Sequence, residues 1–84
     1  MAEKLHRALG PDGIARDPRT EQQLNDTMLA VFGSPAGAEA LAYLRSITIE
    51  MVGGPEITDA QLRHREGMRY LVGIIEARMR KGKK

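Results

Sequence analysis

Few residues in this 84-residue chain have the types and spacing that catalysis or metal binding requires. His64, Arg65 and Glu66 form an H-x-E triplet, which zinc deaminases use together with a downstream pair of cysteines. The chain contains no cysteine, and its other histidine, His6, is far away in the sequence. The glutamates of the expected helices also lack the Glu-x-x-His pairing of di-iron proteins. We therefore expect no catalytic residue, no metal, no cofactor, and a protein that is not an enzyme.

The glycine-rich segment 10–13 (GPDG) is not a phosphate-binding loop, because no strand is expected before it and no G-K-[ST] sequence follows it. Its glycines and proline predict a turn instead. Ser34 has nothing around it that would make it a nucleophile. It precedes a proline, as a helix-capping serine often does.

The strongest charged feature is the C-terminus. Residues 1–59 have a formal charge of −4 and residues 60–84 a charge of +6, an asymmetry that often marks a charged partner or head-to-tail packing. Such a cluster of cations has three possible roles. It can complement the negative end of a helix, or it can contact the phosphates of DNA without reading the sequence. It can also bind an acidic protein. The candidate nucleic-acid contacts are Arg78, Arg80, Lys81, Lys83 and Lys84.

Capping residues and apolar spacing predict three helices. Asp17, followed by a proline, opens a helix over about 18–32. Ser34 opens a second over about 34–52, which two glycines and a proline end. A capping box of threonine and glutamine opens the third, over about 58–80.

The third helix is apolar on two faces. One face carries Met68, Val72, Ile75 and Met79, and the other carries Gly67, Tyr70, Leu71 and Ile74. A helix of this kind must bury both faces, and a chain this short has too little of its own structure to cover them. Gly67 suits a close approach between helices. We expect a homo-oligomer whose interface contains Gly67, Met68, Tyr70, Leu71, Ile74 and Ile75.

These patterns predict an all-α fold dominated by an antiparallel helical hairpin of about 34–52 and 58–80. An irregular N-terminal arm (1–18) should precede the helical domain (19–80), and a basic tail (81–84) should follow it. Leu5 and Leu9 share a short helical face in the arm. The longest apolar runs have four or five residues, so no membrane span is expected. We expect the protein in the cytoplasm of a host cell or in a virion.

Two motifs carry a resemblance to a known family. Residues 32–37, with the leucines at 41 and 44, fit an aromatic-x-[ST]-P-x-G-x-x-x-L-x-x-L pattern. Residues 67–75 fit G-x-R-x-x-V-x-x-I. Over about 31–80 the chain is similar to a small family of tailed-phage proteins encoded among head and packaging genes, with relatives in phage-derived gene transfer agents. Ala36 stands where this family would have an acidic residue.

The resemblance implies a helical hairpin and a role in virion assembly or DNA packaging. Small terminase subunits build oligomers from such hairpins, often with an added DNA-binding part that this chain lacks. The first hypothesis is a non-enzymatic phage or gene-transfer-agent assembly factor. It would be an oligomeric packaging adaptor of small-terminase type that contacts the large terminase or portal and the DNA backbone. The alternatives are a structural component of the head, neck or tail, and a bacterial regulator, for which no DNA-reading helix is seen.

Overall fold

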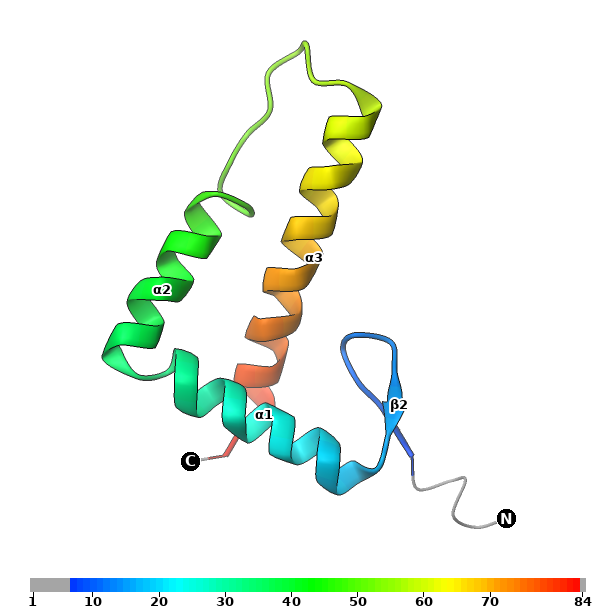
Figure 1. The fold of residues 1–84 in the computed structure, drawn as a ribbon, viewed down its shortest axis with the longest axis vertical. Coiled ribbons are helices and arrows are strands. Elements are labelled where there is room, and N and C mark those ends of the chain that lie inside the picture. The colour runs from blue at the N-terminus through cyan, green and yellow to red at the C-terminus, as the bar shows by residue number, and fades with distance from the viewer. Residues whose placement is uncertain (1–6, 84) are drawn as a thin grey trace.

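Three helices and a two-stranded sheet make up the computed structural model, which describes residues 7–83 (Figure 1). All three predicted helices are present. The all-α prediction is wrong for the N-terminal arm, where residues form a β-hairpin. The elements are β1 (Ala8–Leu9), β2 (Ala15–Arg16), α1 (Pro18–Phe32), α2 (Pro35–Ser46) and α3 (Asp59–Lys81).

The β-hairpin closes through the turn that the sequence predicts at residues 10–13. The amide of Gly10 donates to the carbonyl of Ile14, and the amide of Gly13 donates to the carbonyl of Gly10, both at 3.0 Å. Gly13 has a φ of 82°, which a three-residue hairpin loop requires and glycine adopts freely. Leu9 therefore lies in a strand rather than on a helical face, and Leu5 lies outside the described residues.

The predicted helix starts are confirmed. The Asp17 side chain accepts a hydrogen bond from the amide of Arg19 at 2.8 Å. Ser34 accepts one from the amide of Gly37 at 3.1 Å, and Thr58 caps α3 with both halves of its capping box formed. These caps use only neighbouring residues, so the sequence alone identifies them.

The second helix is shorter than predicted, because it ends at Ser46 and not near residue 52. The hydroxyls of Ser46 and Thr48 donate to main-chain carbonyls three and four residues earlier, which competes with helix hydrogen bonding. Arg69 of α3 donates to the carbonyls of Thr48 and Ile49, the shorter contact being 3.0 Å to Ile49. The chain after α2 is thus held by α3 in a non-helical path.

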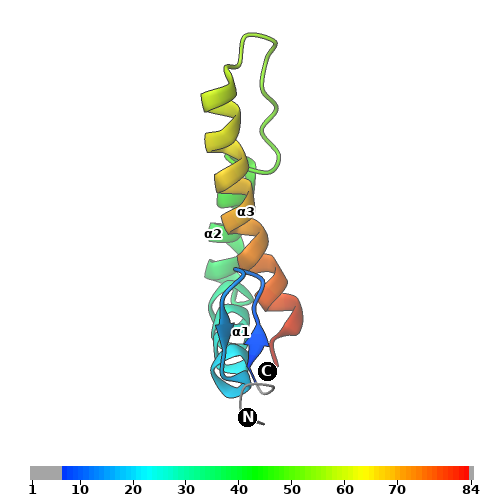
Figure 2. The same cartoon turned by 90° about the vertical axis from the view of Figure 1, so that its right-hand side faces the viewer.

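The molecule is a flat plate. In Figure 1, α2 and α3 run in opposite directions side by side, and α1 crosses the C-terminal end of α3. The Cα trace measures 52 × 34 × 12 Å, and Figure 2 shows its thin edge. The closest helix packing joins α1 to α3, so the α2–α3 hairpin is not the dominant packing unit.

Few apolar side chains are fully buried in this plate. Among the apolar side chains of residues 7–83, only Leu41 of α2, 8% exposed, and Val72 of α3, 3% exposed, are buried. Leu24 and Met28 of α1 are only half-buried. Because this core is small, polar contacts and interfaces contribute a large share of the free energy of folding.

The C-terminal half of α3 is held by an ionic cluster that consists of Asp12, Arg16, Glu21, Asn25 and Arg78. The Arg78 guanidinium donates to the Glu21 carboxylate at 2.8 Å, to the Asn25 side-chain oxygen at 3.0 Å and to Asp12 at 3.2 Å. Arg16 bridges the same two carboxylates, at 2.7 Å to Glu21 and 2.9 Å to Asp12. The cluster thus ties the β-hairpin, α1 and α3 together.

Burial makes the cluster sensitive to the loss of any partner. Arg78 is 3% exposed and Glu21 is 6% exposed. Hydrogen bonds from Arg78 keep the pKa of Glu21 below its ordinary value although burial opposes this shift. The Glu21 carboxylate raises the pKa of Arg78 in return. Both groups are therefore charged at neutral pH, and each is compensated by the other.

Replacing Gly37 by alanine should destabilise the fold by about 1–3 kcal/mol through overpacking. A Cβ at Gly37 would overlap the Val31 carbonyl oxygen and lie 2.8 Å from the Cα of Phe32. Gly73→Ala is the matched control, since a Cβ there meets nothing within 4 Å and alanine favours the helix by up to about 1 kcal/mol. Thermal denaturation measures both variants. Equal melting temperatures would contradict this role of Gly37.

Replacing Arg78 by methionine should lower the free energy of unfolding by about 3–5 kcal/mol, because Glu21 would remain buried without its main partner. Arg80→Met removes the same charge from an exposed position two residues away and should change stability by no more than about 0.5 kcal/mol. Urea denaturation of the two variants gives the comparison. If both variants lose a similar free energy of unfolding, the ionic cluster contributes no more to stability than an exposed charge does.

Candidate interaction surface

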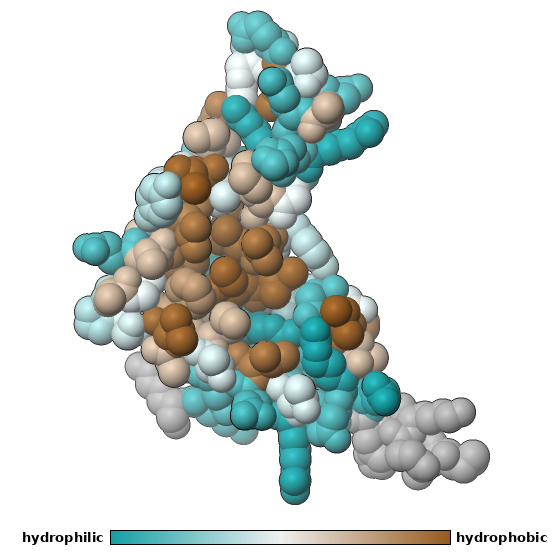
Figure 3. Space-filling model, viewed as in Figure 1, coloured by the Kyte–Doolittle hydropathy of each residue, from teal (hydrophilic) through white to brown (hydrophobic). Residues whose placement is uncertain are grey.

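One side of the plate is apolar. Leu41 of α2 and Val72 of α3 are buried, and helix geometry places the residues three positions further on, Leu44 and Ile75, on one side of the plate. Figure 3 shows apolar side chains gathered over α2 and α3 on the side turned to the viewer. Leu71 is 60% exposed there. We call this surface the apolar face; it comprises Ala40, Leu44, Ile47, Met68, Leu71 and Ile75.

The apolar face contains no charged residue. The residues four positions after Leu41 and Val72 are Arg45 and Glu76, which lie about 100° round each helix from Leu44 and Ile75 and form an ion pair with one another. Glu39 of α2 also lies away from the face. The charged residues in the middle of α3 lie elsewhere around the helix as well; they are Arg63, Arg65, Glu66 and Arg69.

The structure divides the six residues that the sequence predicts for an oligomer interface. Met68, Leu71 and Ile75 belong to the apolar face. Tyr70, in contrast, donates its hydroxyl to the carbonyl of Pro11 at 3.1 Å and so fastens the turn of the β-hairpin. Its neighbour Ile74 is half-buried.

Gly67 does not bring two helices of the chain together. A Cβ at Gly67 would meet nothing within 4 Å, so the close approach predicted there does not occur within the chain. The glycine against which another element packs closely is Gly37, at the start of α2. Whether a second copy approaches Gly67 stays a prediction.

Arg78 is not available to nucleic acid. Its guanidinium is buried in the ionic cluster, and phosphate contact would require that cluster to open. The burial of Arg78 does not support its predicted contact with DNA, which stays a prediction. A run of basic residues in the sequence cannot distinguish this arginine from its exposed neighbours, because its partners lie 53 to 66 positions earlier.

The other predicted cations form the exposed tail. Arg80, Lys81 and Lys83 are exposed, and Lys84 lies outside the described residues. The main chain beneath them is fixed to α1, since Gln22 donates to the Lys81 carbonyl at 3.1 Å. The amide of Lys83 likewise donates to a side-chain oxygen of Asp26 at 2.7 Å. The tail thus presents three charged side chains from an anchored backbone.

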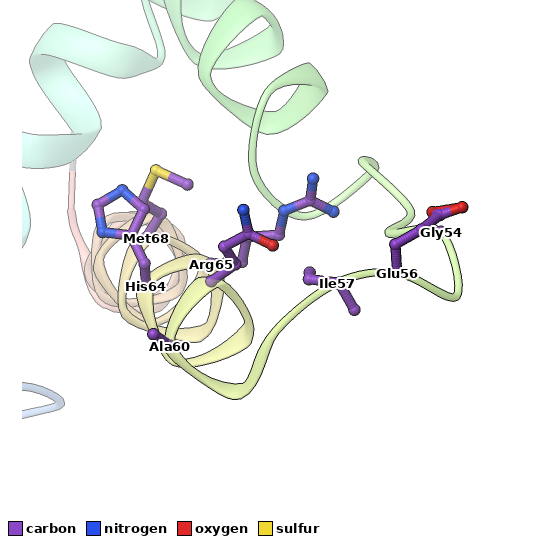
Figure 4. Close-up of a pocket in the computed structure, with 8 residues that line it drawn as sticks. Gly54, Glu56, Ile57, Ala60, His64, Arg65 and Met68 are labelled. Carbon is purple, nitrogen blue, oxygen red and sulfur yellow. The ribbon is translucent and has the colours of Figure 1, made fainter.

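A groove of about 580 Å³ lies between the loop after α2 and the first turns of α3 (Figure 4). Met68 belongs both to this groove and to the apolar face, so the two surfaces are continuous. His64 lines the groove, whereas Glu66 is exposed and pairs with Arg69 at 3.5 Å. The H-x-E triplet therefore forms no common site. The groove is lined by Gly54, Glu56, Ile57, Ala60, Gln61, His64, Arg65 and Met68.

Two negative observations concern residues 7–83. None of the helices there combines the length and the hydrophobicity that a membrane crossing needs. No group of three or more histidine, aspartate or glutamate side chains in the same residues is arranged to hold a metal ion.

A family of phage proteins matches most of the chain. The model of the Bbp19-like phage protein family matches residues 28–82, which include α2, α3 and the whole apolar face. No curated protein and no solved structure matches the chain. The expected resemblance to phage proteins is confirmed. Because the match covers more than half of its residues, the chain belongs to the family of Bbp19-like phage proteins.

Proposed function

We propose that this phage protein is a non-enzymatic assembly factor that acts as a homo-oligomer. The observation that carries the proposal is the apolar face, on which Leu71 is 60% exposed and which lies over two helices placed side by side. Domains bury the apolar sides of their elements between at least two layers. In this proposal a second protein surface supplies the layer that covers α2 and α3.

The energetics favour association. Full burial of a leucine, isoleucine or methionine side chain is worth about 1.5–3 kcal/mol. Leu71 is mostly exposed, and Leu44, Met68 and Ile75 are half-buried. The centres of protein interfaces are depleted in charged residues, as this face is. Copies of the chain are the proposed first partner, and other head or packaging proteins, such as the large terminase or portal, are the proposed further partners.

A packaging adaptor is the more specific form of this proposal. Its support is the exposed tail, with Arg80, Lys81 and Lys83 on an anchored backbone. One tail would bind DNA weakly, with a dissociation constant of about 10⁻⁴ M or more at physiological salt. Several tails in one oligomer would gain affinity through avidity. The alternative is a structural component of the head, neck or tail. Mass spectrometry of purified particles separates the two, since a structural component stays in the particle.

Leu71→Arg should convert the oligomer to a monomer while the chain remains helical, because it places a charge in the centre of the apolar face. Leu62→Arg is the matched control: Leu62 is an exposed leucine of the same helix, 47% exposed, that lies off this face. Light scattering gives the mass, and circular dichroism gives the helix content. A wild-type protein that stays monomeric at high concentration would refute self-association.

Replacing Lys81 and Lys83 by glutamine should weaken DNA binding and reduce its dependence on salt. Loss of two phosphate contacts lowers the slope of log K against log salt by about 2. Arg19→Gln with Arg63→Gln removes two exposed charges elsewhere and should leave the slope unchanged. Salt titrations of a fluorescent duplex measure both. Equal slopes, or no binding at low salt, would argue against the adaptor and for the structural component.

A further inference from the structure

After α3 the chain turns at Gly82 and lies along α1. The Gln22 side chain of α1 donates to the Lys81 carbonyl at 3.1 Å. One helical turn further on, a carboxylate oxygen of Asp26 accepts from the amide of Lys83 at 2.7 Å. The same Asp26 oxygen accepts from the Gln22 side chain at 2.8 Å. Two neighbouring side chains of α1 thus hold the main chain of the tail on both sides of Gly82.

Gly82 is the residue that allows the tail to approach α1 this closely. A Cβ at Gly82 would lie 2.6 Å from the main-chain oxygen of Asn25 and 2.8 Å from the Cβ of Leu29. The Asn25 oxygen belongs to the main chain of α1 and cannot move aside. The backbone of Gly82 is extended, with a φ of −75° and a ψ of 158°, so glycine is needed here for its missing side chain. An alanine at this position would push the tail away from α1.

We propose that Asp26 is a positioning residue, which fixes the tail so that Lys81 and Lys83 meet the phosphates of DNA from an ordered main chain. This inference rests on the proposed contact with DNA and names the residue that prepares the tail for it. When an unanchored tail binds, ordering its main chain and its long side chains costs free energy. A tail that is ordered before binding loses less freedom, so the same cations bind more tightly.

The charge of Asp26 opposes the effect of its hydrogen bonds. The Lys83 amide and the Gln22 side chain lower the pKa of Asp26, so its carboxylate is charged at neutral pH. A negative charge beside a basic tail repels phosphate, and charge alone predicts that its removal strengthens DNA binding. A positioning role predicts that removal of the hydrogen bonds weakens DNA binding. Because the two effects have opposite signs, separate substitutions of Asp26 distinguish them.

The tail lies on the side of α1 away from the apolar face. In Figure 1 the end of α3 passes behind α1, whereas the apolar face is turned to the viewer. Figure 2 shows the same end of α3 beyond α1, opposite to that face. Copies that associate through the apolar face would therefore leave the tail uncovered by their contact. Several anchored tails would then be presented together, as avidity requires.

Asp26→Asn and Asp26→Ala form a matched pair with the same charge. Asparagine keeps a side-chain oxygen that accepts from the Lys83 amide, whereas alanine has no acceptor there. At low salt a fluorescent DNA duplex should bind Asp26→Ala about 3–10-fold more weakly than Asp26→Asn. Asp26→Asn should bind at least as tightly as the wild type, because it loses a negative charge. Equal affinities of the two variants, or tighter binding by Asp26→Ala, would overturn the positioning role.

Gly82→Ala should weaken DNA binding by a similar factor without any change of charge, and Gly73→Ala, where a Cβ has open space, is its control. If Asp26→Ala does not fold by circular dichroism, Gly82→Ala decides the question. With Lys81 and Lys83 both replaced by glutamine, Asp26→Ala and Asp26→Asn should bind equally. A difference that persists there would come from the fold at large and would contradict positioning.

Failure of the proposed DNA contact has a different outcome from failure of the positioning role. A wild-type protein that does not bind the duplex at low salt overturns the DNA contact, and the role of Asp26 with it. A wild-type protein that binds, with equal affinities for Asp26→Ala and Asp26→Asn, overturns only the role of Asp26.

Discussion

The ion pair between Arg78 and Glu21 is the contact on which the arrangement of this chain depends. It joins the last turns of α3 to the start of α1, and Asp12 extends it to the turn of the β-hairpin. With only Leu41 and Val72 fully buried among the apolar residues 7–83, no large core would hold these elements if the pair were broken. Buried ion pairs often add little net stability, but losing one partner is costly. The main effect of the cluster is thus to position α1 and the β-hairpin. Its net contribution to the stability of the fold is smaller.

This position of α1 leaves the rest of the plate uncovered. Because α1 packs across the C-terminal end of α3, no other element among residues 7–83 covers the side of α2 and α3 that carries Leu44 and Leu71. The Arg45–Glu76 ion pair and the hydrogen bonds of Arg69 join α3 to α2 and to the chain that follows it. The proposed partner surface is therefore the side that carries Leu44 and Leu71.

The sequence predicts the parts of this structure that depend on neighbouring residues. The caps at Asp17 and Ser34 and the turn at 10–13 are local, and all are confirmed. The strand pairing of residues 8–9 with 15–16 is also local, and the prediction of an irregular arm missed it. Two other errors involve distant partners. The end of α2 depends on Arg69, about twenty residues away, and the burial of Arg78 depends on carboxylates more than fifty residues earlier. For the candidate interface, helical spacing identifies the apolar positions on α3. It does not show that Tyr70, one of these positions, binds the turn of the β-hairpin.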